Sequence, residues 1–175
     1  LRRSNGSRSA RYACVTAVAL TVLTWRPFLG APEVQFLDVG QGDSAFVRTA
    51  GGDTVLIDAG DRDPRTDWDR GRDTVAPFLR ANHVSRLDYV VASHGDRDHV
   101  GGLPYILEHF RVGALLLPAN ETPEAAEKDL ERRCAARGIP VRRLRRGDVV
   151  ALDGGRLTAL HPPPDWPASS GTNNG

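Results

Sequence analysis

Residues 93–102, with the sequence Ser-His-Gly-Asp-Arg-Asp-His-Val-Gly-Gly, decide the fold of this chain. They follow an apolar run at 87–92 that only Asp88 and Tyr89 interrupt, and such a run predicts a strand buried on both faces. An apolar pattern over 100–110 then predicts a helix. A polar turn between a buried strand and a helix is where an α/β sheet exposes functional groups. The segment therefore predicts a functional site on an α/β fold.

Four side chains that can bind metal fall within six residues of this stretch: His94, Asp96, Asp98 and His99. In a tight turn, His94 and Asp96 can converge on one ion, while Asp98 and His99 point toward a second. Imidazole nitrogen suits zinc, and carboxylate oxygen suits harder ions such as manganese. The spacing therefore predicts a site for two divalent metal ions, manganese or zinc. A surface loop can hold such residues by chance, but buried strand, H-x-D-x-D-H, Gly-Gly and helix in this order are far more specific.

The rest of the chain from residue 33 onward alternates strand and helix patterns, and Gly and Asp turns join the early strands as hairpins. Early hairpins followed by strand–helix alternation predict an α/β layered domain with a mixed sheet. The predicted strands are 34–39, 44–49, 54–57, 87–92, 113–117, 139–141, 148–152 and 156–161, and the predicted helices are 74–81, 100–110 and 121–137.

Length and composition bound the other possibilities. With 175 residues, of which 40% are hydrophobic and 26% charged, the chain suits one packed domain and is too hydrophobic for a disordered segment. The net charge of +1 means that any contact with a polyanion must come from a local patch. Cys14 and Cys134 lie in unlike surroundings, which argues against a disulfide or a cysteine metal site. The lack of Met and the polar stretch at 172–175 predict that both ends are cut.

Residues 1–31 predict a basic flank and one transmembrane helix ahead of a domain at 32–175. Four arginines fall within 1–11, and 12–25 carry no charge before Arg26 and Pro27. A spanning helix needs about 20 apolar residues, so this run is short unless its flanks share the membrane depth. A cleaved signal peptide and a buried soluble helix are the alternatives. In the first two cases the basic flank stays cytoplasmic, which places the domain outside the cytoplasm.

Three motifs occur in a set order: Asp-Val-Gly-Gln-Gly-Asp-Ser at 38–44, Leu-Ile-Asp-Ala-Gly at 56–60, and the metal-binding stretch at 94–102. The last resembles the H-x-H-x-D-H signature of the metallo-β-lactamase fold. All three together resemble the extracytoplasmic domain of ComEC/Rec-type DNA internalisation (competence) proteins, the membrane proteins of natural transformation. The resemblance runs from about residue 33 to the end. It implies an αββα sandwich that is incomplete at its C-terminus.

The resemblance also implies roles for the matching residues. His94 and Asp96 would be ligands of a first ion, and Asp98 and His99 of a second; Asp98 would also orient or deprotonate the attacking water. Asp96 stands where most of the superfamily has His, which implies a harder metal or a weaker zinc site and argues against β-lactam hydrolysis. The supporting residues would be Asp58, accepting hydrogen bonds from the metal loop, and Gly40, Gly42 and Asp43, shaping the loop beside the site.

One departure from the family concerns later ligands, because the fold normally adds another His and a bridging Asp from later strands. Only His109 and His161 follow His99 in this chain. His109 lies within a predicted helix and is expected to be structural or exposed. His161 ends a strand before prolines, and a ligand role is the weaker interpretation for it. The missing ligands are expected beyond Gly175, so this chain alone is expected to bind metal poorly and to be inactive.

Two charged tracts lie outside the motifs. Residues 61–73 alternate Asp with Arg but lack the spacing of a calcium loop, which predicts a flexible surface loop beside the site. A basic tract around the last predicted helix could contact DNA phosphates, or could simply be a solvated face. Its candidate DNA contacts are Arg142, Arg143, Arg145 and Arg146.

The resemblance implies a membrane-anchored, extracytoplasmic, metal-dependent hydrolase domain of a DNA-uptake protein, cleaving DNA phosphodiesters with a metal-bound hydroxide. Its expected partners are DNA, in particular a single strand, the membrane and other DNA-uptake components. Two alternatives stay open. One is a hydrolase of the same fold that acts on another ester, thioester or lactam, since a fold alone does not select a substrate. The other is a non-catalytic module that guides DNA through a transport channel.

Overall fold

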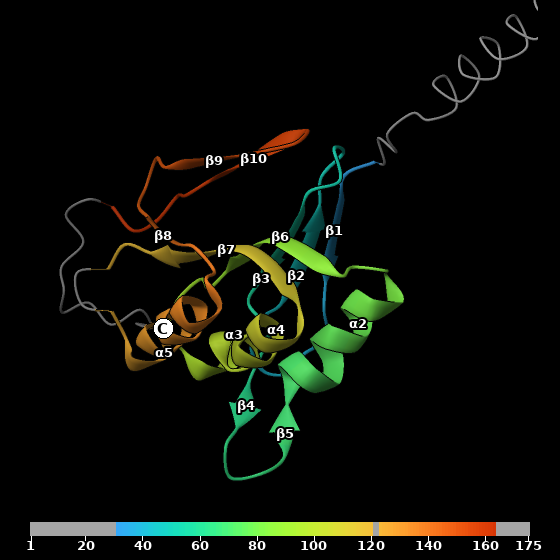
Figure 1. Cartoon of the computed structure of the whole chain (residues 1–175), viewed down its shortest axis with the longest axis vertical. Coiled ribbons are helices and arrows are strands. Elements are labelled where there is room, and N and C mark those ends of the chain that lie inside the picture. The colour runs from blue at the N-terminus through green and yellow to red at the C-terminus, as the bar shows by residue number, and fades with distance from the viewer. Residues whose placement is uncertain (1–30, 121–122, 164–175) are drawn as a thin grey trace, which may run out of the picture.

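The computed structural model describes residues 31–120 and 123–163, and a six-stranded mixed sheet forms their centre (Figure 1). The strand order in this sheet is β1-β2-β3-β6-β7-β8, and two further pairs, β4-β5 and β9-β10, form separate ribbons. The strands are β1 (Glu33–Phe36), β2 (Ala45–Arg48), β3 (Thr54–Ile57), β4 (Arg62–Asp63), β5 (Trp68–Asp69), β6 (Arg86–Val91), β7 (Arg111–Pro118), β8 (Val141–Leu144), β9 (Val149–Leu152) and β10 (Gly155–Thr158).

Strand direction changes within this sheet and thereby positions the candidate site. Strands β1, β2 and β3 pair antiparallel as hairpins, whereas β3, β6, β7 and β8 pair parallel. Parallel neighbours need crossover connections, and helices supply these here. Ile57 at the end of β3 pairs with Val91 at the end of β6. The two loops that follow these strands, each carrying one of the sequence motifs, therefore begin side by side at the same edge of the sheet.

The helices gather on one side of the main sheet, and the β9-β10 ribbon lies on the other (Figure 1). Pro77 and Pro104 lie in the first turns of α2 and α4, where the missing N–H costs no hydrogen bond, and left-handed Gly138 ends α5. The elements are a π-helical turn η1 (Gly71–Val75), α2 (Ala76–Ala81), α3 (Arg97–Val100), α4 (Leu103–His109) and α5 (Ala125–Arg137).

The single helix predicted over 100–110 is instead two helices, α3 and α4, separated by Gly101 and Gly102. The backbone N–H of Gly102 donates a hydrogen bond of 3.0 Å to the carbonyl of Gly60. A Cβ atom at Gly102 would overlap the backbone of Ala59 and Gly71. The glycine pair thus lets the helix start close to the loop after β3, and that tertiary contact interrupts the helical pattern.

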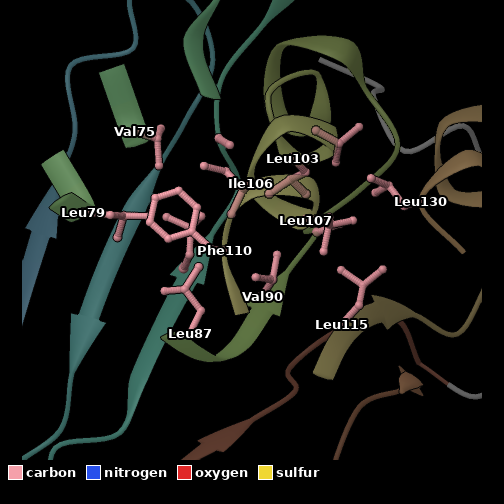
Figure 2. Close-up of a cluster of buried hydrophobic side chains, with 14 of the residues drawn as sticks. Val75, Leu79, Leu87, Val90, Leu103, Ile106, Leu107, Phe110, Leu115 and Leu130 are labelled. Atoms are coloured by element: carbon pink, nitrogen blue, oxygen red, sulfur yellow. The ribbon is translucent and has the colours of Figure 1, made fainter. Parts of the chain in front are cut away.

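The hydrophobic core lies between the sheet and the helices (Figure 2). Val90 and Leu115 reach it from neighbouring strands, while Leu103, Ile106 and Leu107 reach it from α4. All five side chains are fully buried, in agreement with the apolar patterns from which the strands and the helix were predicted. The core therefore fixes the parallel strands whose ends carry the metal loop.

Replacing Ile106 by Ala is expected to reduce the free energy of unfolding by about 2–5 kcal/mol, since it removes buried methyl groups and leaves a cavity. Ile106 is 0% exposed at the centre of the cluster. Chemical denaturation measures the change. Lys128→Ala on the exposed face of α5 is the control, with an expected change within about 0.5 kcal/mol. A loss below about 1 kcal/mol for Ile106→Ala would contradict this packing.

The opposite face of the sheet is also apolar. Ile57, Val91 and Leu116 are register neighbours on this face, and together with β10 they line a cavity of about 290 Å³. Toward β1 the face is open, with Phe36 84% exposed. The predicted mixed-sheet α/β fold is thus confirmed. Of the predicted αββα sandwich, the described residues contain one helical layer, the main sheet and the β9-β10 ribbon.

One prediction is wrong, and two others lie outside the described residues. Residues 61–73, predicted as a surface loop, contain the β4-β5 hairpin and the turn η1, because ion pairs tie its arginines to its carboxylates. The transmembrane helix was predicted within residues 1–31, and Cys14 was predicted to form no disulfide. Residues 1–30 lie outside the described residues. In the part that the structure describes, no helix combines the length and the apolar character needed to cross a membrane.

Candidate metal centre

The loops after β3 and β6 are joined by backbone hydrogen bonds before any side chain contributes. The N–H of Asp58 donates to the carbonyl of Val91 at 2.9 Å, which extends the parallel pairing by one step. The N–H of Ala59 donates to the carbonyl of His99 at 2.8 Å. The metal loop is therefore held against residues 58–60 by the main chain.

Asp58 lies at the centre of this arrangement and is 2% exposed. Its backbone is left-handed, with φ of 56°, a conformation that Asp adopts more readily than most residues. One carboxylate oxygen accepts the N–H of Ser93 at 2.8 Å, and the other accepts the Ser93 hydroxyl at 2.5 Å and contacts His99 Nδ1 at 3.0 Å. Asp58 thus accepts hydrogen bonds from Ser93 and contacts His99 in the structure, and its supporting role in a metal site stays a prediction.

The same carboxylate determines which nitrogen of each histidine carries the proton. Since Asp58 can only accept as a carboxylate, the neutral tautomer of His99 that fits this contact donates from Nδ1 and keeps its lone pair on Nε2. The Ser93 hydroxyl donates its proton to Asp58 and so is an acceptor toward His94 Nδ1, 2.8 Å away. His94 therefore also keeps a lone pair on Nε2. Both imidazoles are prepared as metal ligands in the way that carboxylate–histidine–metal arrangements require.

The structure brings several of the predicted ligands together in pairs. The His94 and His99 rings lie 4.0 Å apart between centroids. His94 Nε2 is 3.4 Å from Asp96 Oδ2, and His99 Nδ1 is 3.9 Å from the exposed carboxylate of Asp43. Asp98 is positioned through its main chain, which packs against Gly42. The donor types of His94 and Asp96 suit a divalent ion. Asp43 instead faces His99 Nδ1, the nitrogen that also faces Asp58 and is not the one left for a metal.

The set of ligands is not complete within residues 31–120 and 123–163. No three His, Cys, Asp or Glu side chains in those ranges converge closely enough to hold a metal ion. Burial raises the pKa of the Cys134 thiol to about 11, so this thiol stays protonated and does not add a ligand. What the described residues supply is a pair of oriented histidines with carboxylates beside them.

Gly42 allows the motif at 38–44 to approach the metal loop. Its φ is 93°, and a Cβ atom built on it would overlap the backbone carbonyl of Asp98. Gly40, with φ of 74°, likewise leaves room for the guanidinium of Arg70. The two glycines thus permit close approaches to Asp98 and Arg70, and their role in a metal site stays a prediction.

Replacing Gly42 by Ala is expected to destabilise the fold by more than about 1 kcal/mol, because both the left-handed backbone and the overlap with Asp98 oppose a side chain. Gly52→Ala is a matched control. Its φ is 99°, but a Cβ atom there would meet nothing within 4 Å, so it measures backbone strain alone. Chemical denaturation of both variants gives the comparison. Equal losses would show that the Asp98 contact contributes nothing.

The two later histidines differ in position. His109 is exposed on α4, where its ring stacks on Tyr105 at 3.9 Å and Nδ1 faces the Tyr105 carbonyl. His109 is thus exposed and interacts within its own helix, in line with the expectation that it is not a metal ligand. His161 lines the cavity on the open sheet face, and Ser93 lines that cavity too. The structure thus brings His161 toward the loop that carries His94.

The basic tract is not uniform. The guanidinium of Arg143 contacts Glu127 at 3.0 Å, Glu131 at 2.8 Å and the carbonyl of Pro118 at 2.8 Å. These contacts use the hydrogen-bond donors of Arg143 within the protein, which argues against the DNA contact that the sequence predicted for it. The other three predicted contacts are exposed: Arg142, Arg145 and Arg146.

Glu127 is the buried partner of Arg143, and burial raises the pKa of its carboxyl group above the ordinary value of 4.5, although hydrogen bonds from Arg143 and Asn120 oppose the rise. The folded protein therefore binds this proton more tightly than the unfolded chain. The resulting stability is fully present below about pH 4.5 and is lost as the pH rises through the folded-state pKa.

Glu127→Gln is therefore expected to remove this part of the pH dependence. Urea denaturation between pH 4 and 7 should show the stability of the variant, relative to the wild type, rising with pH over that window. The matched control is Glu131→Gln, which changes another carboxylate on the same Arg143 but one that is 36% exposed. Parallel curves for wild type and Glu127→Gln would contradict the prediction.

Sequence reasoning missed two neighbours of the metal loop. Ser93 connects Asp58 to His94 through its hydroxyl, and its position directly before the first His was the only signal in the sequence. Glu124 lies over the loop, because a Cβ atom at Gly95 would overlap its carboxylate. Nothing in the spacing of Gly95 and Glu124 pointed to this contact.

A comparison with known protein families covers most of the chain. Residues 37–170 match the model of the metallo-beta-lactamase superfamily. The chain belongs to this superfamily. ComE operon protein 3 of Bacillus subtilis (strain 168) is 29% identical over 152 residues, which are 81% of this chain and 20% of that protein. This match confirms the similarity to ComEC-type, metallo-β-lactamase-like proteins. The superfamily comprises metal-dependent hydrolases, and the mixed α/β sheet with its metal loop is consistent with membership.

Other similar proteins are more distant. Lactamase-like protein vrtG of Penicillium aethiopicum is 29% identical over 105 residues, 60% of this chain and 31% of that protein. This chain therefore spans less than a third of the length of either curated relative. Among solved structures, a diphosphatase from the PhnP family has a TM-score of 0.43 at 21% identity, over 67% of this chain and 43% of its own. CmlA, a diiron beta-hydroxylase from Streptomyces venezuelae, has a TM-score of 0.49 at 20% identity, over 75% of this chain and 24% of its own.

Proposed function

We propose that this chain is the metal-dependent hydrolase domain of a DNA-uptake protein and that it cleaves DNA phosphodiesters. The observation that supports the proposal most is the pair of imidazoles, His94 and His99, with ring centroids 4.0 Å apart and both oriented from the buried carboxylate of Asp58. Such preparation of two lone pairs is typical of a metal centre and has no use in a surface loop. The similarity to ComE operon protein 3 supports the assignment to DNA uptake.

In this proposal each residue of the loop has a task. His94 and Asp96 would hold one divalent ion, and His99 and Asp98 would hold a second. A bound divalent ion supplies Lewis-acid polarisation of the phosphoryl oxygens. Asp98 orients the attacking water and accepts its proton, and Asp58 holds both imidazoles in the required tautomer.

The substrate is taken to be DNA, in particular a single strand, and exposed arginines contribute to its binding. Arg142, Arg145 and Arg146 are exposed around β8 and the turn that follows, where they can neutralise phosphates. The proposal also includes membrane anchoring through residues 1–31 and a position of the domain outside the cytoplasm. Protease accessibility in intact cells compared with lysed cells tests that position, and digestion only after lysis would contradict it.

The activity itself is tested in protein that runs from Ala31 through the natural C-terminus, so that the later ligands expected from the sequence are included, with single- and double-stranded DNA and manganese or zinc. We expect degradation that a chelator abolishes and that is lost in His99→Ala. A neutral ester and a β-lactam are assayed in parallel, because members of one fold act on different substrates. Hydrolysis of these without degradation of DNA would replace our proposal by a hydrolase with another substrate.

A second candidate is a non-catalytic module that guides DNA. It is favoured by one observation, namely that no three metal-binding side chains converge within the described residues. DNA binding without hydrolysis of any tested substrate, in protein that binds manganese or zinc stoichiometrically, would favour this candidate over the nuclease.

A further inference from the structure

The four arginines in residues 61–73 differ in whether their charge is neutralised. Arg62 pairs with Asp69, Arg65 with Asp63, and Arg72 with both Asp67 and Asp73. Arg97, from the metal loop, pairs with Asp61. Among these arginines, only Arg70 has no ion pair with any residue in the described ranges. The segment therefore contains one arginine that forms no ion pair, although its charge, after the interactions with Arg72, helps to lower the pKa of the Asp73 carboxyl group.

Arg70 is also held in a defined position. It directly follows β5, and its guanidinium lies over the ring of Trp68 at 4.6 Å from the centroid. Its Nη2 atom lies 3.1 Å from the point where a Cβ atom of Gly40 would be. Stacking on an aromatic ring orders a guanidinium without consuming its hydrogen-bond donors. Arg70 is thus pre-arranged against the glycine-containing loop.

The donors of Arg70 are not satisfied by the protein. Its Nε atom is buried and has no hydrogen-bond partner among the described residues. A buried N–H without a partner destabilises a fold, and native proteins rarely keep one without a function. The residue as a whole is only partly buried.

The position of Arg70 links it to the candidate metal centre. The loop at 38–43, which covers Arg70 at Gly40, touches the metal loop through Gly42 against Asp98. It touches that loop again through Asp43, whose carboxylate is 3.9 Å from His99 Nδ1. Gly40 is exposed, and the loop that it shares with Gly42 and Asp43 therefore connects the position of Arg70 to the metal loop.

A guanidinium without an ion pair fits a planar or tetrahedral oxyanion, to which it can donate two parallel hydrogen bonds. We propose that Arg70 binds a non-bridging oxygen of a substrate phosphate beside the Gly40–Gly42 loop and thereby selects anionic phosphodiesters over neutral esters. The substrate class in this inference rests on the proposed function. The binding of phosphate by Arg70 can be measured without any turnover.

The first test measures binding alone. A fluorescein-labelled single-stranded oligothymidylate is titrated against the metal-free full chain at several salt concentrations, for wild type, Arg70→Gln, Arg70→Lys and Arg65→Gln. Arg65→Gln is the matched control, because it removes an arginine of the same hairpin that is exposed and paired with Asp63. We expect Arg70→Gln to weaken binding about 10- to 100-fold and to reduce the salt slope by about one. Arg70→Lys should keep the slope and lose only part of the affinity.

A second measurement needs no variant. Wild-type protein is modified with phenylglyoxal, which reacts with arginine, with and without inorganic phosphate, and the sites are read by mass spectrometry. Phosphate should protect Arg70 and leave Arg65 reactive. Equal protection of both, or none, would overturn the proposal even if Arg70→Gln fails to fold.

The kinetic test separates this inference from the proposed function. With manganese or zinc present, Arg70→Gln should raise the KM for bis(p-nitrophenyl) phosphate about tenfold or more and leave p-nitrophenyl acetate hydrolysis unchanged. Equal losses on both substrates, or binding and kinetics like those of Arg65→Gln, would show that Arg70 does not recognise phosphate. If wild type does not hydrolyse the phosphodiester, the proposed function fails, and the oligonucleotide and protection experiments still decide the role of Arg70.

Discussion

Replacing His99 by Ala is expected to reduce metal-dependent hydrolysis by about a thousandfold or more. A bound metal ion contributes several kcal/mol to transition-state stabilisation, and about 1.4 kcal/mol corresponds to a factor of ten in rate. His99 is half of the oriented histidine pair, and its imidazole is the group that links Asp58 directly to the centre. Removing it takes away a ligand and also leaves a buried carboxylate without that partner.

The measurement is turnover of a phosphodiester with manganese or zinc, together with metal stoichiometry and thermal unfolding of the same samples. His109→Ala is the matched control, because that histidine is exposed on α4 and interacts with Tyr105 of its own helix. We expect the control to keep the activity of the wild type. If folded His99→Ala hydrolyses the substrate within about tenfold of wild type, the metal loop is not the site of the reaction.

Asp58→Ala is expected to weaken metal binding by about 10- to 100-fold, the usual effect of removing a hydrogen-bond partner of a ligating histidine. It should also lower the free energy of unfolding by about 1–3 kcal/mol or more, because the N–H of Ser93 then loses its buried acceptor. Both effects are expected because Asp58 joins Ser93, His94 and His99 in one network.

Asp58→Asn separates the two effects. Asn also tolerates the left-handed backbone at this position, so the loop can keep its path. Its amide can accept from Ser93 through oxygen, but its NH₂ group cannot accept from His99 Nδ1 or from the hydroxyl. We therefore expect stability close to wild type with weakened metal binding, measured by isothermal titration with manganese or zinc. Unchanged affinity in both Asp58 variants would remove the role assigned to the network.

Much of the fold could be predicted because its signals are local. The apolar run before the metal loop, the hairpins at the start and the amphipathic pattern ending at Arg137 each depend on neighbours in the sequence, and all appear in the structure. The helix predicted over 100–110 was wrong at one point. Its break at Gly101 and Gly102 depends on the backbone of Ala59, Gly60 and Gly71, which the local pattern does not contain.

For the candidate site, too, some features follow from the sequence alone and others only from the tertiary structure. The sequence by itself determined which donors are available, because His94, Asp96, Asp98 and His99 fall in one turn after a buried strand. It also determined, through the motif order, the superfamily that the match over residues 37–170 shows. Both follow from spacing along the chain.

Only the tertiary structure decided how these donors are oriented and which charges remain free. Asp58 reaches Ser93 and His99 across 35 and 41 positions, contacts that arise from the parallel pairing of β3 with β6. In the Asp/Arg stretch, composition alone suggests that every charge has a partner. Folding the β4-β5 hairpin assigns the carboxylates to other arginines and leaves Arg70 on Trp68, because an ion pair depends on a distance of a few ångströms in space and not on proximity in sequence.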